Sequence, residues 1–222
     1  MMGKNVLRLS AVISAISGLI ILAGVIVPIL SYKSPGLLSP IPEVKNQTVE
    51  ELDYTKASNW FVGGATPEDF VSPSVSFYTL SIPKLKIENA TVAIGGEDLS
   101  KNLIQYPGTA VPGKNGNAVI FGHSILPIFY DPKNYISIFS TLPTLKKGDE
   151  INVNYDGVSY KYRVENLFEV QPTDIQVLEQ DTSDSYLTLV TCVPPGDPRK
   201  PKRLIVRAKV VPPEITNENT RR

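Results

Sequence analysis

The sequence predicts an all-β fold: a closed or nearly closed barrel of seven to eight strands with short helices, preceded by an N-terminal transmembrane helix. Three observations support this. An uncharged apolar run stands near the N-terminus, short runs of β-branched and aromatic residues follow from Ser76 onward, and helical patterns are few. Because a closed barrel leaves no exposed sheet edge, we expect this many short strands in one domain to close.

The first element is the apolar run at 9–32, which contains no charged residue. It exceeds the ~20 residues that a membrane-spanning helix needs. Lys4 and Arg8 precede it and the first acid is Glu43, so the positive-inside rule places residues 1–8 in the cytoplasm. A cleaved signal peptide is the alternative, but the run is longer than a typical h-region and no clear A-x-A site follows. We therefore expect a single-pass cell-membrane protein whose remaining residues are extracellular.

Residues 33–75 are predicted to form an extracellular linker. "YKSPGLLSPIPEV" and "GGATPEDFVSPS" are rich in Pro, Ser and Gly, which favours extended or irregular structure. Trp60 and Phe61 interrupt this polar composition. They either pack on the domain that follows or belong to a flexible arm.

The domain expected at 76–212 contains seven strand-length runs. They are "SFYTLSI", "ATVAI", "NAVIFG", "EINVNY", "SYKYRVENLFEV", "YLTLVTC" and "RLIVRAKVV". Asp156-Gly157, between two of these runs, is a good hairpin signal. Helical patterns are limited to "GEDLSKNLI" and "NYISIFSTLPTL", and residues 213–222 form a polar C-terminal tail.

The single cysteine, Cys192, ends the run "YLTLVTC". Successive side chains of a strand point to opposite faces, so Cys192 lies on the face opposite Leu187 and Leu189. In "RLIVRAKV", Arg203 likewise lies opposite the apolar face that begins with Leu204. If both apolar faces point into the core, Cys192 and Arg203 point away from it, and the thiol is more than a packing residue.

The chemistry of a reactive thiol needs a base, and the chain has one histidine, His123, at the end of "GNAVIFGHS". An arginine can stabilise an oxyanion with fixed donors and charge. One His and one Cys cannot fill a tetrahedral zinc site without carboxylates, so metal binding is weakly supported. The 22 Lys and Arg residues balance 22 Asp and Glu residues, which argues against nucleic acid as a partner.

Several motifs resemble the sortase family over about Leu80 to Val211. "TLVTC" at 188–192, followed eleven residues after the cysteine by Arg203, is similar to the sortase signature. "YPGTAVPGKNGNAVIFGHS" resembles the segment that leads into the catalytic histidine of that family. "SIPKLKIENATVAIG" resembles the opening strands of its barrel.

This resemblance implies a cysteine transpeptidase (a thiol endopeptidase of the cell surface). We expect no cofactor, and no metal, because the calcium-binding acids of one sortase subfamily cannot be placed residue by residue in this sequence. Cys192 would be the nucleophile that attacks the Thr–Gly bond of an LPxTG-like sorting signal on secreted proteins. His123 would be the general acid and base, Arg203 would stabilise the oxyanion and position the substrate, and Thr191 would help to hold the substrate. An amine from a cell-wall precursor or a pilin lysine would resolve the thioester.

Two further features concern specificity within the family. The tether lacks the Asp-Pro-aromatic lid motif of pilin-assembling sortases and the chain ends in the polar "PPEITNENTRR", so we expect anchoring of surface proteins to the cell wall. "QPTDIQVLEQDTSDS" corresponds in order to the specificity loop of the family. Its Ile175, Val177 and Leu178 either form an apolar wall for the leucine of the sorting signal or simply pack a short helix.

Other classes of protein are alternatives to a sortase. A cell-wall L,D-transpeptidase would place its histidine a few residues from the cysteine, whereas His123 and Cys192 are 69 residues apart. A papain-like hydrolase would place the cysteine before the histidine. A non-catalytic membrane-tethered β-domain for adhesion or surface assembly is the alternative from another class, and thiol labelling separates it from an enzyme.

Overall fold

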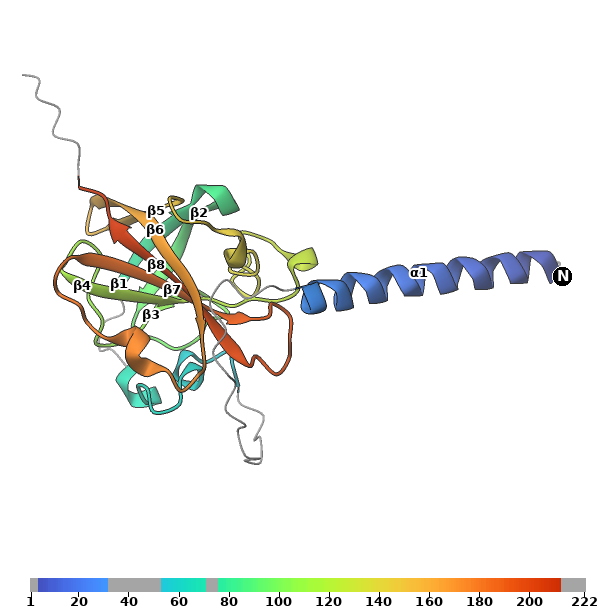
Figure 1. The fold of residues 1–222 in the computed structure, drawn as a ribbon, viewed down its shortest axis with the longest axis horizontal. Coiled ribbons are helices and arrows are strands. Elements are labelled where there is room, and N and C mark those ends of the chain that lie inside the picture. The colour runs from blue at the N-terminus through green and yellow to red at the C-terminus, as the bar shows by residue number, and fades with distance from the viewer. Residues whose placement is uncertain (1–3, 32–52, 71–75, 213–222) are drawn as a thin grey trace, which may run out of the picture.

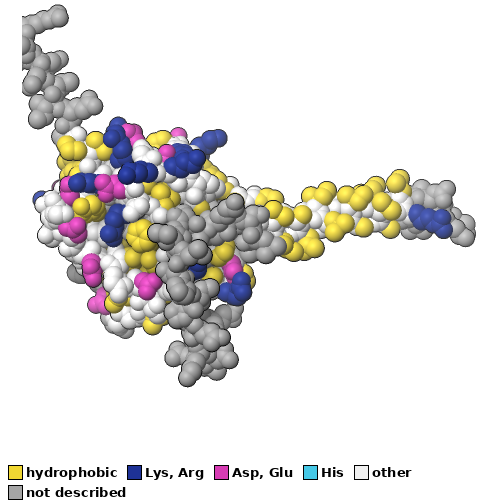
Figure 2. Space-filling view, viewed as in Figure 1, with side chains coloured by type: hydrophobic (Ala, Val, Ile, Leu, Met, Phe, Trp, Pro, Cys, Tyr) yellow, Lys and Arg dark blue, Asp and Glu magenta, His cyan; other side chains and the backbone are white. Residues whose placement is uncertain are grey.

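The computed structural model describes residues 4–31, 53–70 and 76–212 (Figure 1). Helix α1 (Lys4–Ser31) projects from one end of the folded domain. Within the described residues it is the one helix long and apolar enough to cross a membrane, over Arg8–Val27, with a mean hydropathy of 2.5. Hydrophobic side chains cover α1 along its length, whereas charged side chains are scattered over the domain (Figure 2). This helix could therefore anchor the chain in a membrane.

The strands form a closed barrel in the order β1-β2-β3-β4-β7-β8-β6-β5, and β5 pairs with β1 to complete it. β2 with β3 and β4 with β7 are parallel pairs, and the remaining pairs are antiparallel. The eight strands are β1 (Ser76–Ile82), β2 (Ile87–Ile94), β3 (Leu103–Gln105), β4 (Gly116–Phe121), β5 (Glu150–Tyr155), β6 (Val158–Val170), β7 (Ser185–Val193) and β8 (Lys202–Val210). The predicted closed β-barrel is confirmed.

Short 3-10 helices occupy the connections and the segment before the barrel. They are η1 (Ala57–Trp60), η2 (Pro67–Phe70), η3 (Pro83–Leu85), η4 (Pro127–Phe129), η5 (Leu142–Thr144) and η6 (Ile175–Leu178). The hairpin signal at Asp156-Gly157 is borne out, because both residues have positive φ (50° and 75°) between the paired Tyr155 and Val158.

The helical expectation for "GEDLSKNLI" is wrong. Leu103–Gln105 form β3, which joins β2 to β4, and all three residues are buried. The second helical stretch retains only the single turn η5. In both places the requirement to close the barrel and to bury apolar side chains outweighs local helix propensity.

The barrel strands β4 and β7, and β8 over residues 203–206, are buried on both faces. Their inward side chains, including Leu187, Leu189 and Leu204, belong to the core inside the barrel. Their outward side chains, including Val190 and Ile205, belong to a second apolar cluster outside it. The parallel pair β4 and β7 consequently reads as two largely hydrophobic runs, as parallel strands covered on both sides do.

Residues 53–70, here called the cover segment, complete this second cluster from the outside. Trp60, Phe61 and Phe70 are buried, and the Trp60 ring stacks on Phe121 with centroids 5.2 Å apart. Of the two alternatives for Trp60 and Phe61, packing on the domain is therefore the observed one.

Main-chain hydrogen bonds hold the cover segment at several points. Val62 N donates to Pro172 O (2.9 Å), Leu99 N donates to Thr55 O (3.0 Å), and Gly96 N donates to Phe70 O (2.7 Å). Part of the stretch predicted as linker is thus an ordered layer on the barrel. The rest of that stretch, 33–52 and 71–75, lies outside the described residues, as does the predicted polar tail at 213–222.

Candidate active site

Cys192 and Arg203 are directly opposite each other on the antiparallel strands β7 and β8. Residues opposed in this way have Cβ atoms about 5 Å apart and share a face. That face is the outer one, since Cys192 belongs to the cluster between the barrel and the cover segment. The predicted register and the predicted facing of these two residues are both observed.

β4 carries His123 to the same place. β4 runs parallel to β7 with Phe121 paired to Val190, and Gly122 N donates to Val190 O (3.1 Å). Ser124 Oγ then donates to Cys192 O (2.6 Å), so the residues on either side of His123 are tied to β7. A Cβ on Gly122 would lie 2.5 Å from Phe139 Cδ2, so only glycine fits at this turn.

Arg203 is fully buried and its guanidinium is held by main-chain oxygens. Nε donates to Trp60 O (3.0 Å), and Nη1 donates to Lys200 O (2.9 Å) and Lys202 O (3.2 Å). The guanidinium carbon also lies 5.4 Å from the ring centroid of Tyr54 and 5.6 Å from that of Trp60. Among the described residues Nη2 has no hydrogen-bond partner. One buried donor of a cation is therefore left for a further acceptor.

Cys192 is only 2% exposed. Burial raises the pKa of its thiol, and the nearby charges of Arg203 and Lys200 oppose that increase. In this closed arrangement the thiol is favoured over the thiolate.

His123 is 5% exposed. Burial, assisted by the positive charge of Lys200, lowers its pKa to about 4, so the imidazole is neutral at pH 7. Phe139 N donates to His123 O (2.9 Å), which fixes the backbone at this residue. A neutral imidazole can accept a proton from a thiol, as a general base must.

Trp60 is the central residue of the cover. Its ring centroid lies 5.8 Å from that of His123, and its carbonyl accepts the Arg203 hydrogen bond. The ring thus contacts two of the three predicted catalytic residues and helps to exclude water from the third. In the sequence, the only signal was a single tryptophan within a polar stretch.

Lys200 is the site residue for which the sequence offered no signal. Its ammonium lies 4.9 Å from the Tyr54 ring centroid, and burial lowers its pKa. It contributes positive charge near Cys192 and His123. Arg199, in contrast, pairs with Asp197 (2.7 Å), and its side chain is 79% exposed.

Thr191 is fully buried and faces away from Cys192. Its hydroxyl donates to Gly122 O (2.7 Å), which links the cysteine strand to the turn that carries His123. In this structure the hydroxyl therefore holds the site together. Contact of Thr191 with a substrate stays a prediction.

The residues of the predicted specificity loop divide between packing and lining. Val177 in η6 is buried in the second cluster, and its carbonyl accepts hydrogen bonds from Asn117 (3.1 Å) and Arg207 (3.1 Å). Ile175 and Leu178 line a cavity of about 450 Å³ together with Gly64 of the cover segment. Val177 thus packs a short helix, as one alternative expected. Contact of Ile175 and Leu178 with the leucine of a sorting signal stays a prediction.

The arrangement supports nucleophilic chemistry. No three His, Cys, Asp or Glu side chains gather to hold a metal ion in the described ranges. What the site contains is a thiol, a neutral imidazole, a guanidinium with a free donor, and an apolar cover that excludes water. These are the components of covalent thiol catalysis.

Comparison with known proteins identifies the family. Residues 80–211 match the sortase domain, so the chain belongs to the sortase family. Sortase A of Bacillus anthracis is 30% identical over 178 residues, covering 74% of this chain and 78% of that protein. Sortase A of Streptococcus agalactiae is 25% identical over 179 residues, covering 77% and 70% of the two chains.

Solved structures of sortases have a similar fold. A Clostridium perfringens sortase D5 transpeptidase superposes with a TM-score of 0.52 at 28% identity, covering 61% of this chain and 79% of that one. A lid mutant of sortase A from Corynebacterium diphtheriae gives a TM-score of 0.54 at 28% identity, covering 64% and 74%. The protein is a sortase-type transpeptidase of the cysteine class.

Proposed function

We propose that this chain cleaves an LPxTG-like sorting signal and joins the cleaved protein to an amine, with Cys192, His123 and Arg203 as its catalytic residues. The observation that carries the proposal is the direct pairing of the single cysteine with a buried arginine that has a free Nη2 donor. A guanidinium in this position can donate to the oxygen that becomes negative when the thiolate attacks a carbonyl.

The chemistry has two halves. The Cys192 sulfur forms a bond to the threonine carbonyl carbon of the signal while His123 accepts the thiol proton. The Thr–Gly C–N bond then breaks, and His123 returns that proton to the departing amine, which leaves a thioester. In the second half an acceptor amine attacks the thioester, its proton passes to His123 and then to the leaving Cys192 sulfur, and an amide bond forms.

The closed site requires the cover to move before a substrate can bind. Cys192 and His123 are both buried beneath Trp60, so a peptide carbonyl has no access to the sulfur in this arrangement. A cavity lined by Gly64, Ile175 and Leu178 lies between the cover segment and η6. We assign Ile175 and Leu178 to the apolar wall for the leucine of the signal, and Val177 to the support of that wall.

The partners follow from this assignment. The substrates are secreted proteins with an LPxTG-like signal, and the acceptor is an amine such as a cell-wall precursor or a pilin lysine. α1 inserts in the cell membrane with residues 1–8 in the cytoplasm and the barrel outside the cell, in line with the Lys and Arg residues before the apolar run. We propose that the chain anchors surface proteins to the cell wall.

The test is a transpeptidation assay with the full chain in detergent. A panel of fluorogenic LPxTG-like peptides is incubated with small amines, and the ligated product is quantified by mass spectrometry. We expect product with the wild type and none with Cys192→Ala or His123→Ala, while Arg199→Ala, which alters an exposed arginine of the same loop, retains activity. Ligation by Cys192→Ala would refute the proposal, and no ligation of any peptide by the wild type would favour a non-catalytic domain.

A further inference from the structure

The loop between β4 and β5 carries an apolar tip, residues 124–130, on the domain surface. Ile128 is 65% exposed and Phe129 is 62% exposed, and Ile136 of the same loop is 47% exposed. Among the described residues outside α1, seven large hydrophobic side chains are exposed, and these three belong to this one loop. Exposed apolar side chains that cluster in this way mark an interaction surface.

The tip is suited to an apolar environment. Residues 124–130, "SILPIFY", carry no charge, and the first charged residue after them is Asp131. Phe129 N donates to Leu126 O (2.9 Å) and Tyr130 N donates to Pro127 O (3.1 Å), so these amides are already paired. The Tyr130 hydroxyl donates to Leu85 O. The tip can therefore enter an apolar phase while these donors keep their hydrogen bonds.

The tip lies beside the membrane anchor. A Cβ built on Gly24 of α1 would be 3.7 Å from Ile128 Cδ1, and η4 lies at the end of the domain nearest α1 (Figure 1). Gly24 precedes Val27, the end of the apolar span, by three residues, which is about 4.5 Å along the helix. Because the uncharged run continues to Tyr32, Ile128 lies at least about 5 Å below the end of that run, a depth at which interfacial apolar groups enter a bilayer.

We propose that the apolar tip, with Ile128 and Phe129 at its apex, inserts into the outer leaflet of the membrane that α1 spans. The occupant of this surface is lipid, because the surface is continuous with the apolar surface of α1 and lies at the depth where that helix leaves the membrane. The inference rests on the membrane orientation proposed for α1, and it is independent of the transpeptidase reaction.

Insertion would fix the position of the active site relative to the membrane. The tip begins directly after His123, and its Ser124 is bonded to Cys192 O. A Cβ on Gly196, in the loop after the cysteine, would lie 2.5 Å from Leu126 Cγ, so that loop packs closely on the tip. Contact between Phe129 and lipid would therefore hold the site at a set height above the bilayer, within reach of substrates that are themselves held in the membrane.

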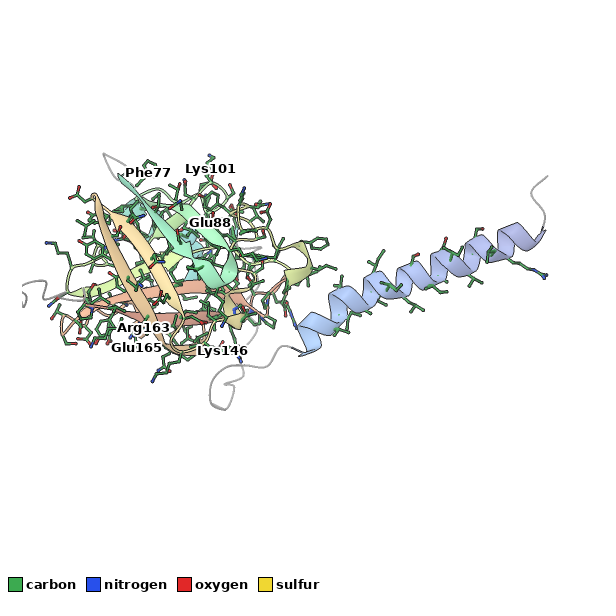
Figure 3. The ribbon with its side chains drawn as sticks, turned by 90° about the horizontal axis from the view of Figure 1, so that it is seen from above. Phe77, Glu88, Lys101, Lys146, Arg163 and Glu165 are labelled. Atoms are coloured by element: carbon green, nitrogen blue, oxygen red, sulfur yellow. The ribbon has the colours of Figure 1, made fainter. Side chains whose placement is uncertain are left out.

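The test uses the full chain in lipid nanodiscs with Cys192→Ala, which leaves no other cysteine. An environment-sensitive fluorophore is attached at Phe129→Cys, at the matched control Phe77→Cys, and at Leu19→Cys within the span. Phe77 is 57% exposed and lies on the side of the domain away from α1 (Figure 3). Quenching is measured with nitroxide-labelled lipid and with aqueous iodide.

We expect nitroxide lipid to quench the probes at 129 and 19 several-fold more than the probe at 77, and iodide to show the opposite order. Equal quenching at 129 and 77 would overturn the proposal. Protection of position 129 from iodide without quenching by lipid would overturn it in favour of a protein partner, such as a second copy. A lack of lipid quenching at position 19 would overturn the anchor and the docking together, and none of these results depends on whether the enzyme cleaves a sorting signal.

Discussion

Replacement of Trp60 by alanine should open the active site while the barrel stays folded. The Trp60 side chain is fully buried, and its ring packs on Phe121, His123 and the Arg203 guanidinium. The substitution removes these contacts but keeps the Trp60 carbonyl that accepts the hydrogen bond from Arg203 Nε. It therefore tests the ring alone.

The size of the effect can be worked out from this burial. Truncation of a buried tryptophan to alanine costs about 3–5 kcal/mol. If about 3 kcal/mol of this falls on the equilibrium between the closed and open cover, the open fraction rises about 100-fold, since each 1.4 kcal/mol is a factor of ten. The rate at which a methanethiosulfonate labels the chain should rise by a similar factor, and Cys192 is the only thiol it can report.

The assay is the labelling rate under native conditions, with circular dichroism to confirm that the barrel remains folded. Val62→Ala is the matched control, because Val62 lies on the same cover segment and is 64% exposed. We expect no change in rate for this control. A labelling rate for Trp60→Ala within twofold of the wild type, with the barrel intact, would refute the reasoning that the ring keeps the site closed.

Three further predictions concern the residues around the thiol. Arg203→Lys should lose most of kcat, because an ammonium lacks the forked donors of a guanidinium, whereas Arg207→Ala should keep kcat and raise KM several-fold as the Val177 carbonyl of η6 loses a donor. If steady-state kinetics showed a larger loss of kcat for Arg207→Ala than for Arg203→Lys, the pairing of Cys192 with Arg203 would not identify the catalytic arginine. Because burial lowers the pKa of His123 to about 4, below its ordinary ~6.5, the unfolded state binds more protons between these values. The free energy of unfolding should therefore fall by up to about 3 kcal/mol as pH drops from about 6.5 to 4. Thermal melting of the wild type and of His123→Gln across this pH range checks this, and an equal pH dependence of stability in the two proteins would contradict it. Thr191→Val should lower the free energy of unfolding by about 1–2 kcal/mol, because it leaves Gly122 O without its donor. Thr191→Ser keeps the hydroxyl and should retain most of that stability in denaturant titrations. Equal stability of the two variants would argue against this hydrogen bond.

The strand pattern of the sequence predicted the barrel and the facing of its two key residues. Period-two alternation placed Cys192 and Arg203 on the outer face, and the structure pairs them across β7 and β8. β3 was missed because three residues are too few to show a period, and because they stand in a stretch with local helix propensity. Its strand conformation depends on β2 and β4, which lie on either side of it.

The cover could not be predicted for a related reason. The segment that contains Trp60 has the composition of a linker, and its order comes from contacts with residues far along the chain, such as Phe121, Pro172 and Arg203. Lys200 likewise reaches the site only through the conformation of the loop between β7 and β8. Contacts between distant segments do not appear in local periodicity.

The most direct test of the account is detection of the acyl-enzyme. The full chain is mixed with an LPxTG-like peptide in the absence of an amine, and the intact protein and its proteolytic fragments are analysed by mass spectrometry. We predict a mass increase equal to the peptide up to its threonine, located on the fragment that contains Cys192, and its loss when an amine is added. An adduct that persists in Cys192→Ala, or the absence of any adduct on both the wild type and the opened Trp60→Ala variant, would contradict thiol transpeptidation at this site.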